Sequence, residues 1–122
     1  MTLLRLDAVQ KSFGAVTVAN QLSYDVTQGE ALGVIGPNGA GKTSMFNLIT
    51  GTLTPDSGQV WFDGQNISAH SSARRCRAGV ARSFQVPQPF SGMTVFENAM
   101  IAATQSAGLH GAQAERFCLE IL

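Results

Sequence analysis

Net charge, cysteine and long apolar runs are all scarce in this sequence. Eight Lys and Arg residues balance eight Asp and Glu, so the formal net charge is zero, and charged residues make up only 13% of the 122. Such a chain has no long-range field to attract DNA, RNA or an anionic membrane, and we expect no nucleic-acid partner. The longest stretch free of polar side chains, residues 31–37, is much shorter than the roughly 18 residues of a membrane span.

The two cysteines, Cys76 and Cys118, are far apart and fit neither a CxxC nor a zinc-ligand spacing. We interpret them as reduced side chains that serve as small apolar residues. Charged residues interrupt the apolar ones in residues 1–7, which excludes a secretory signal peptide there. We therefore expect a cytoplasmic protein, and 122 residues suit a single domain.

The hydrophobic pattern predicts several strands. Residues 4–8 alternate between apolar and charged side chains, residues 16–26 show a further β-type pattern, and residues 59–62 form a short strand before a turn. A turn is expected at 11–14. Residues 31–35 and 80–84 are also predicted to be strands, and the first is a continuous apolar run without alternation, as in a parallel sheet covered on both faces.

Helices are predicted over 42–49, 71–77 and 95–103. The last begins with a capping box, in which Thr94 and Glu97 satisfy each other's backbone amides. A final amphipathic segment places five side chains on one stripe: Ala114, Phe117, Cys118, Ile121 and Leu122. Because no helix-stop signal follows this stripe, we expect the sequence to continue in its parent.

The segment 36–43, GPNGAGKT, satisfies the phosphate-loop pattern G-x-x-x-x-G-K-[ST] in full. It follows an apolar segment and opens a predicted helix, as the chemistry requires. Gly36, Gly39 and Gly41 permit close approach of the backbone to a phosphate. Successive amides then form an anion nest at the positive end of the helix. The pattern also assigns Lys42 to the β- and γ-phosphates and Thr43 to Mg²⁺.

The phosphate loop alone leaves a transporter motor, a GTPase and a small-metabolite kinase open. No N/T-K-x-D or D-x-x-G pattern is present, which argues against the GTPase. Phe13 suits either a stacking platform or a half-buried aromatic in a turn, and Gln85 alone reads as an ordinary loop residue.

Together with these residues, the loop resembles that of the ATP-binding cassette (ABC) family, the ATPase subunits of membrane transporters. Phe13 matches the aromatic residue that stacks on adenine in that family, and residues 81–85, ARSFQ, resemble the Q-loop. Residues 84–98 follow F-Q-x-P-x-x-F-x-x-M-T-V-x-E-N and are similar to the ATPase subunits of branched-chain amino-acid importers. In that group the segment receives the permease, with Phe90, Met93 and Phe96 as apolar anchors; a capped core helix explains Phe96 equally well.

The resemblance implies an α/β P-loop NTPase fold, with an antiparallel β subdomain and part of a RecA-like parallel-sheet core. It implies ATP and Mg²⁺ as ligands, Lys42 and Gln85 as catalytic residues, and Thr43 and Gln85 at the metal. It assigns nucleotide contacts to ten residues: Phe13, Val18, Gly36, Asn38, Gly39, Ala40, Gly41, Lys42, Thr43 and Ser44. The implied partners are permease subunits, a second ATP-binding subunit in a homo- or heterodimer and, indirectly, a periplasmic solute-binding protein. The implied location is the inner face of the cell membrane.

Some family motifs are absent from the sequence. It has no LSGGQ signature, no four apolar residues followed by Asp-Glu, and no later switch histidine. We therefore expect residues 1–122 to be the N-terminal part of a single ATP-binding domain of a solute importer, without efficient turnover by itself. A nucleotide-binding or permease-docking module without ATPase activity is the alternative, and a small-metabolite kinase fits less well.

Overall fold

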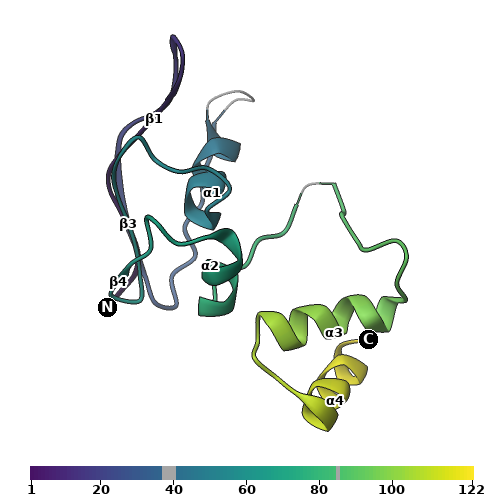
Figure 1. The fold of residues 1–122 in the computed structure, drawn as a ribbon. Coiled ribbons are helices and arrows are strands. Elements are labelled where there is room, and N and C mark those ends of the chain that lie inside the picture. The colour runs from purple at the N-terminus through teal and green to yellow at the C-terminus, as the bar shows by residue number, and fades with distance from the viewer. Residues whose placement is uncertain (37–40, 85) are drawn as a thin grey trace. The chain divides into compact units, whose positions relative to one another are not determined.

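The computed structural model describes residues 1–36, 41–84 and 86–122. The chain forms two compact units, Met1–Ser72 and Ala73–Leu122. The first contains the strands and the helix that follows the phosphate loop, and the second contains most of a short helix and two longer ones (Figure 1). None of the described helices combines the length and the apolar character needed to cross a membrane.

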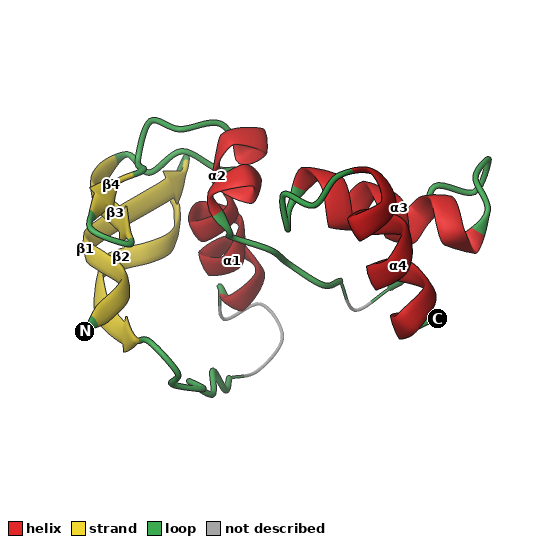
Figure 2. Cartoon of the chain, turned by 90° about the horizontal axis from the view of Figure 1, so that it is seen from below, coloured by secondary structure: helices red, strands yellow, loops and turns green. Residues whose placement is uncertain are grey.

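The described residues of the first unit form one antiparallel sheet of four strands (Figure 2). The strands are β1 (Thr2–Phe13), β2 (Val16–Thr27), β3 (Ser57–Phe62) and β4 (Gln65–Asn66), in the order β2-β1-β3-β4. The alternation predicted for residues 4–8 and the strand predicted for 59–62 are thus confirmed. The tight β1–β2 turn consists of Gly14 and Ala15 alone, so the prediction of a turn from residue 11 onward is wrong. Residues 11–13 stay in β1 because β2 continues to pair with them.

Irregular register shapes the hairpin of β1 and β2. The pairing between β1 and β2 shifts register at several points along the two strands. At two of these shifts Ala8 and Gln21 have positive φ angles, 49° and 50°. At a third, Lys11 pairs with Ala19 but Ser12 pairs with Thr17, so Val18 is an extra residue on β2. Such bulges bend and twist a strand locally and can redirect a backbone group.

Helix α1 (Lys42–Thr50) belongs to this unit and has left-handed residues at both ends, Gly41 and Gly51. It buries Met45, Leu48 and Ile49, the face predicted from their spacing. The Tyr24 hydroxyl on β2 donates to Met45 Sδ at 3.3 Å, which ties the helix to the sheet. Buried side chains of the sheet and its neighbours complete the apolar interior: Leu6, Val9, Ala19, Val60 and Ile67.

The described residues of the second unit form most of α2 (Ser72–Ala78), together with α3 (Val95–Gln105) and α4 (Gly111–Ile121). The capping box of α3 is confirmed: Glu97 N donates to Thr94 Oγ1 at 3.1 Å, and Thr94 N donates to Glu97 Oε1 at 3.0 Å. Helices α3 and α4 pack through a core of Ala103, Ala114 and Cys118. Phe117, Ile121 and Leu122 of the predicted stripe are exposed.

The two predicted strands at 31–35 and 80–84 are wrong in this structure. Both segments are irregular, and residues 31–36 are exposed throughout. A buried parallel strand depends on ladder hydrogen bonds from its neighbours and on helices over both faces. The sheet formed by the described residues includes no strand that pairs with either segment. Their apolar side chains therefore remain accessible, as Ile35 (96% exposed) and Phe84 (49% exposed) show.

Candidate phosphate-binding site

The N-terminus of α1 carries the predicted phosphate site. Gly41 adopts φ 93° and ψ 7°, and the first intrahelical hydrogen bond runs from Met45 N to Gly41 O at 2.9 Å. The amides of the three preceding helical residues, Lys42, Thr43 and Ser44, therefore lie before the first donor of the helical ladder. No side chain caps the helix at Gly41, and its first turn contains no acidic residue. This helix end thus favours an anion through both its amides and its dipole.

The ammonium group of Lys42 returns to the start of the loop, where it donates a hydrogen bond to the carbonyl oxygen of Gly36. One lysine side chain thus joins the two ends of the segment 36–42. Lys42 is half-buried, Thr43 is exposed and Ser44 is half-buried. The Lys42 cation and the Thr43 hydroxyl therefore both lie at the N-terminus of α1. The predicted contacts Asn38, Gly39 and Ala40 lie outside the described residues, as does Gln85.

The bulge on β2 lies directly against the start of α1. A Cβ added to Gly41 would come within 2.7 Å of the Val18 carbonyl oxygen, a distance that real Cβ atoms essentially never show. The site therefore requires glycine at position 41 for two reasons, its left-handed φ and this close approach. Val18, which the sequence resemblance assigned to the nucleotide, is brought to the phosphate loop by its backbone.

Phe13 lies at the last position of β1, paired with Val16, and 50% of its surface is exposed. It belongs to the same hairpin end as Val18, which contacts Gly41. Lys11 Nζ lies 5.3 Å from the centre of the Phe13 ring, within the range of a cation–π contact. The described part of the site therefore combines an exposed aromatic ring, a bare helix N-terminus, a lysine and a hydroxyl.

Lys11 and Asp56 were not selected from the sequence, but the structure connects them to this hairpin end. Asp56 Oδ1 accepts from Lys11 Nζ at 3.2 Å, and Asp56 Oδ2 accepts from Ser12 N at 2.8 Å. The hydrogen bonds from the Ser12 amide and the Lys11 ammonium hold the pKa of the Asp56 carboxyl below its usual range. A separation of 45 residues leaves no local sequence signal for this pair.

A metal ion at this site would take most of its coordinating oxygens from a bound phosphate compound and not from the protein. No group of three or more His, Cys, Asp or Glu side chains in the described parts of the chain is placed to hold a metal ion. Mg²⁺ is commonly bound by one or two protein oxygens together with substrate phosphates. The exposed hydroxyl of Thr43 fits the role of one such oxygen.

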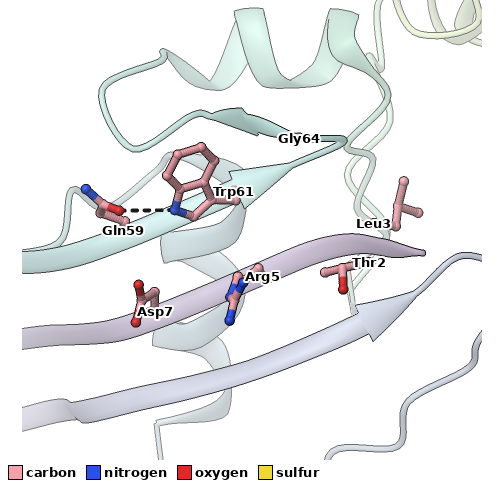
Figure 3. A pocket seen from close by; sticks show the side chains of 7 residues that line it. All are labelled: Thr2, Leu3, Arg5, Asp7, Gln59, Trp61 and Gly64. Carbon is pink, nitrogen blue, oxygen red and sulfur yellow. Dashed lines mark hydrogen bonds between the residues drawn. The ribbon is translucent and has the colours of Figure 1, made fainter.

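A separate pocket of about 310 Å³ lies at the opposite end of β1, on the outer face of the sheet (Figure 3). Its polar side chains face one another across β1 and β3, with Arg5 opposite Trp61 and Asp7 opposite Gln59. They already have partners in part: Trp61 Nε1 donates to Gln59 Oε1 at 3.1 Å, and Arg5 Nε lies 3.4 Å from an Asp25 carboxylate oxygen. None of the predicted site residues that the structure describes lines this pocket.

The three predicted permease anchors divide into two groups. Phe90 and Met93 are 57% and 43% exposed, whereas Phe96 packs against the core of the second unit. Asn98 orders the segment before α3, because its Oδ1 accepts from Phe90 N at 2.8 Å and its Nδ2 donates to Thr94 O at 2.9 Å. Phe90 and Met93 are thus accessible to solvent, while Phe96 contributes to the packing of α3 and α4.

A family model for the ABC transporter matches residues 19–120. The fold and the phosphate site therefore define a P-loop NTPase of the ATP-binding cassette type, and the chain belongs to the ABC transporter family.

Several of the similar proteins are ATP-binding proteins of amino acid or sugar transport. The chain is 40% identical over 101 residues to a "Probable branched-chain amino acid transport ATP-binding protein LivG" of Methanocaldococcus jannaschii, which covers 83% of this chain and 39% of the relative. It is 35% identical over 103 residues to the high-affinity branched-chain amino acid transport ATP-binding protein LivG of Salmonella typhimurium, covering 84% and 40%. The ribose import ATP-binding protein RbsA of Corynebacterium glutamicum is 39% identical over 102 residues, covering 84% and 20%. The chain thus spans about two fifths of the length of the branched-chain amino acid relatives.

Solved structures show the same fold. A nucleotide-free ATP-binding cassette from an ABC transporter matches with a TM-score of 0.75 at 35% identity, over 96% of this chain and 46% of that one. A dimeric post-hydrolysis cassette bound to ADP and Pi matches with a TM-score of 0.81 over 97% of this chain and 55% of that one. At 20% identity, the second likeness concerns the fold alone.

Proposed function

We propose that this chain is the N-terminal part of an ATP-binding subunit that couples ATP binding and hydrolysis to solute import through a membrane permease. The observation that carries the proposal is the bare N-terminus of α1, where Gly41 packs on Val18 and Lys42 reaches back to Gly36. The similarity to branched-chain amino acid transport proteins supports an amino acid of that kind, or a similar small polar solute, as the cargo.

The residues of the site fit a triphosphate. The amides of residues 42–44 and the helix dipole supply donors and partial positive charge, with no side-chain cap to compete for them. Lys42 adds a full charge close to the loop and would exchange its Gly36 carbonyl partner for phosphate oxygens. Thr43 would supply one oxygen to Mg²⁺, and Val18 keeps the helix start in place through its contact with Gly41.

Phe13 would bind the base. Its exposed ring lies at the end of the hairpin whose bulge contacts the phosphate loop, and base–aromatic stacking is worth about 1–3 kcal/mol. The phosphoanhydride of bound ATP supplies the free energy that the subunit transmits to the permease. In this proposal Gln85 orients water or Mg²⁺ and senses the permease, as the family resemblance implies.

The assembly follows from the same resemblance. We assign the subunit to the inner face of the cell membrane, against permease subunits, with a second ATP-binding subunit and an indirect link to a periplasmic solute-binding protein. Phe90 and Met93, both exposed and held by the Asn98 hydrogen bonds, are the apolar contacts proposed for the permease.

The sequence supplies one reason to keep a second function. It contains neither an LSGGQ signature nor an Asp-Glu pair after four apolar residues, so residues 1–122 lack the expected catalytic base. By themselves these residues would then act as a nucleotide-binding or permease-docking module without ATPase activity. Measurement of phosphate release by residues 1–122 and by any longer chain that contains them would separate the two functions.

Binding tests the phosphate site directly. We expect MgATP to bind the complete protein and Lys42→Ala to weaken that binding by roughly 10- to 100-fold, since a charge-assisted hydrogen bond contributes about 1.5–3 kcal/mol. Isothermal titration calorimetry measures the affinity, and Arg116→Ala, which removes an exposed cation on α4, is the control. If MgATP does not bind, or binds Lys42→Ala as well as the parent protein, the proposed phosphate site is wrong.

A further inference from the structure

Asp56 holds three consecutive residues of β1 at the edge of the candidate site. Its amide donates to Gln10 O at 2.8 Å, its Oδ1 accepts from Lys11 Nζ at 3.2 Å, and its Oδ2 accepts from Ser12 N at 2.8 Å. Asp56 immediately precedes β3, so a residue 44 positions away from Ser12 fixes the end of β1. Both carboxylate oxygens are thus used on the strand that ends with Phe13.

Lys11 connects this carboxylate to the aromatic ring. Residues 11 and 13 point to the same side of β1, because side chains alternate along a strand. Lys11 Nζ lies 5.3 Å from the centre of the Phe13 ring, and only 16% of the Lys11 side chain is exposed. A lysine without a partner loses considerable side-chain entropy when it is ordered. The ion pair with Asp56 keeps the Lys11 cation close to the Phe13 ring.

We infer that Asp56 is a positioning residue for base recognition: it holds Lys11 over one face of Phe13 and leaves the other face for adenine. The inference rests on the proposed function, in which Phe13 stacks on the base. Without the Asp56 contacts, Lys11 returns to solvent, the end of β1 loses its tie to the residue before β3, and the ring has more orientations. Binding of the base then includes the entropy cost of ordering Phe13 and Lys11.

The test compares two ligands that share the phosphate chain and differ in the base. In the complete protein, we expect Asp56→Asn to weaken MgATP binding about three- to tenfold and to leave Mg-tripolyphosphate binding unchanged. Lys11→Met should show the same selective loss, and Lys11→Arg, which keeps a cation for both Asp56 and Phe13, should restore most of the ATP affinity. Asp25→Asn is the matched control, because Asp25 also pairs with a cation and is similarly exposed (46% against 48% for Asp56).

A double-mutant cycle separates positioning from general support of the fold. In the Phe13→Ala background, Asp56→Asn should have no further effect on MgATP binding. The inference would be overturned if Asp56→Asn weakened MgATP and tripolyphosphate binding equally. It would also be overturned if Asp56→Asn weakened MgATP binding as much in the Phe13→Ala background as in the parent protein. Failure of the proposed function looks different, because the parent protein then binds neither ligand. If Phe13→Ala weakens MgATP binding while Asp56→Asn leaves it unchanged, the platform stands and the role of Asp56 is wrong.

Discussion

Gly41 lies so close to Val18 that a Cβ at position 41 would come within 2.7 Å of the Val18 carbonyl oxygen. The contact joins a bulge in the β hairpin to Gly41, the N-cap residue of α1, at the candidate phosphate site. It connects β2, which begins opposite Phe13, with the end of the loop proposed to bind phosphate, so the two parts of the candidate site are linked through the backbone.

Replacement of Gly41 by alanine should damage both stability and binding. A non-glycine residue at φ 93° is strained by about 1–3 kcal/mol, and its Cβ also collides with the Val18 backbone. We expect the free energy of unfolding to fall by at least this amount in urea denaturation, with a larger proportional loss of MgATP affinity. Gly33→Ala, at an exposed position with open space around it, should stay within about 0.5 kcal/mol. Equal stability of the two variants would contradict the close contact.

Replacement of Thr43 by valine tests the metal role. The change keeps the shape of the side chain and removes the exposed hydroxyl, so ATP binding in the presence of Mg²⁺ should weaken about tenfold. Binding measured with EDTA should not change. Thr50→Val is the control on the same helix, because the Thr50 hydroxyl donates to Phe46 O at 3.0 Å. An equal loss with and without Mg²⁺ would exclude Thr43 as a metal ligand.

Gly58 is expected to matter for the fold and not for the ligand. It has φ 84°, and a Cβ there would come 2.6 Å from Val9 Cα, next to the bulge at Ala8. We expect Gly58→Ala to lower the free energy of unfolding by about 2–6 kcal/mol, because strain and overpacking add. Gly64→Ala has a similar φ of 78° with open space around it and should lose only about 1 kcal/mol. If thermal or urea unfolding showed similar losses of stability for the two variants, the positive φ alone, and not the close contact with β1, would account for the cost.

The capping box of α3 predicts the effect of removing its hydroxyl. Thr94→Ala deletes the acceptor of the Glu97 amide and should cost about 1 kcal/mol of stability, measured by urea denaturation followed by circular dichroism. Thr54→Ala, at an exposed position outside α3, should have little effect. If the two substitutions cost the same, the cap does not stabilise α3.

The same box predicts a dependence on acid. Hydrogen bonds from the backbone and side chain of Thr94 hold the pKa of the Glu97 carboxyl below its usual range. Its contribution to stability is therefore complete above the ordinary glutamate pKa of about 4.3 and is lost as the pH falls through the lowered value. Unfolding measured between pH 7 and pH 2 should show this loss in the parent protein and less of it in Thr94→Ala. The alanine variant keeps the Thr94 backbone amide, so an identical pH dependence would show that the Thr94 hydroxyl does not contribute to this lowered pKa.

Local sequence patterns were sufficient to predict the helix ends that are set by interactions between residues close together in the sequence. Thr94 and Glu97 predicted the start of α3, and the phosphate-loop pattern predicted the start of α1, because capping and left-handed glycine act within a few residues. The same patterns failed at residues 31–35 and 80–84. An apolar segment becomes a strand only when other strands supply its hydrogen bonds, and that supply depends on distant parts of the chain.

The sequence by itself therefore determined which residues are candidates for the proposed chemistry: a glycine-rich loop, a lysine, a hydroxyl and an aromatic residue of the types that suit a nucleotide. Only the tertiary structure decided which groups support them. The bulge that sends the Val18 carbonyl toward Gly41, and the carboxylate of Asp56 that holds Lys11 over Phe13, join residues 23 and 45 positions apart. Contacts over such distances arise from strand register and packing, which local preferences do not specify.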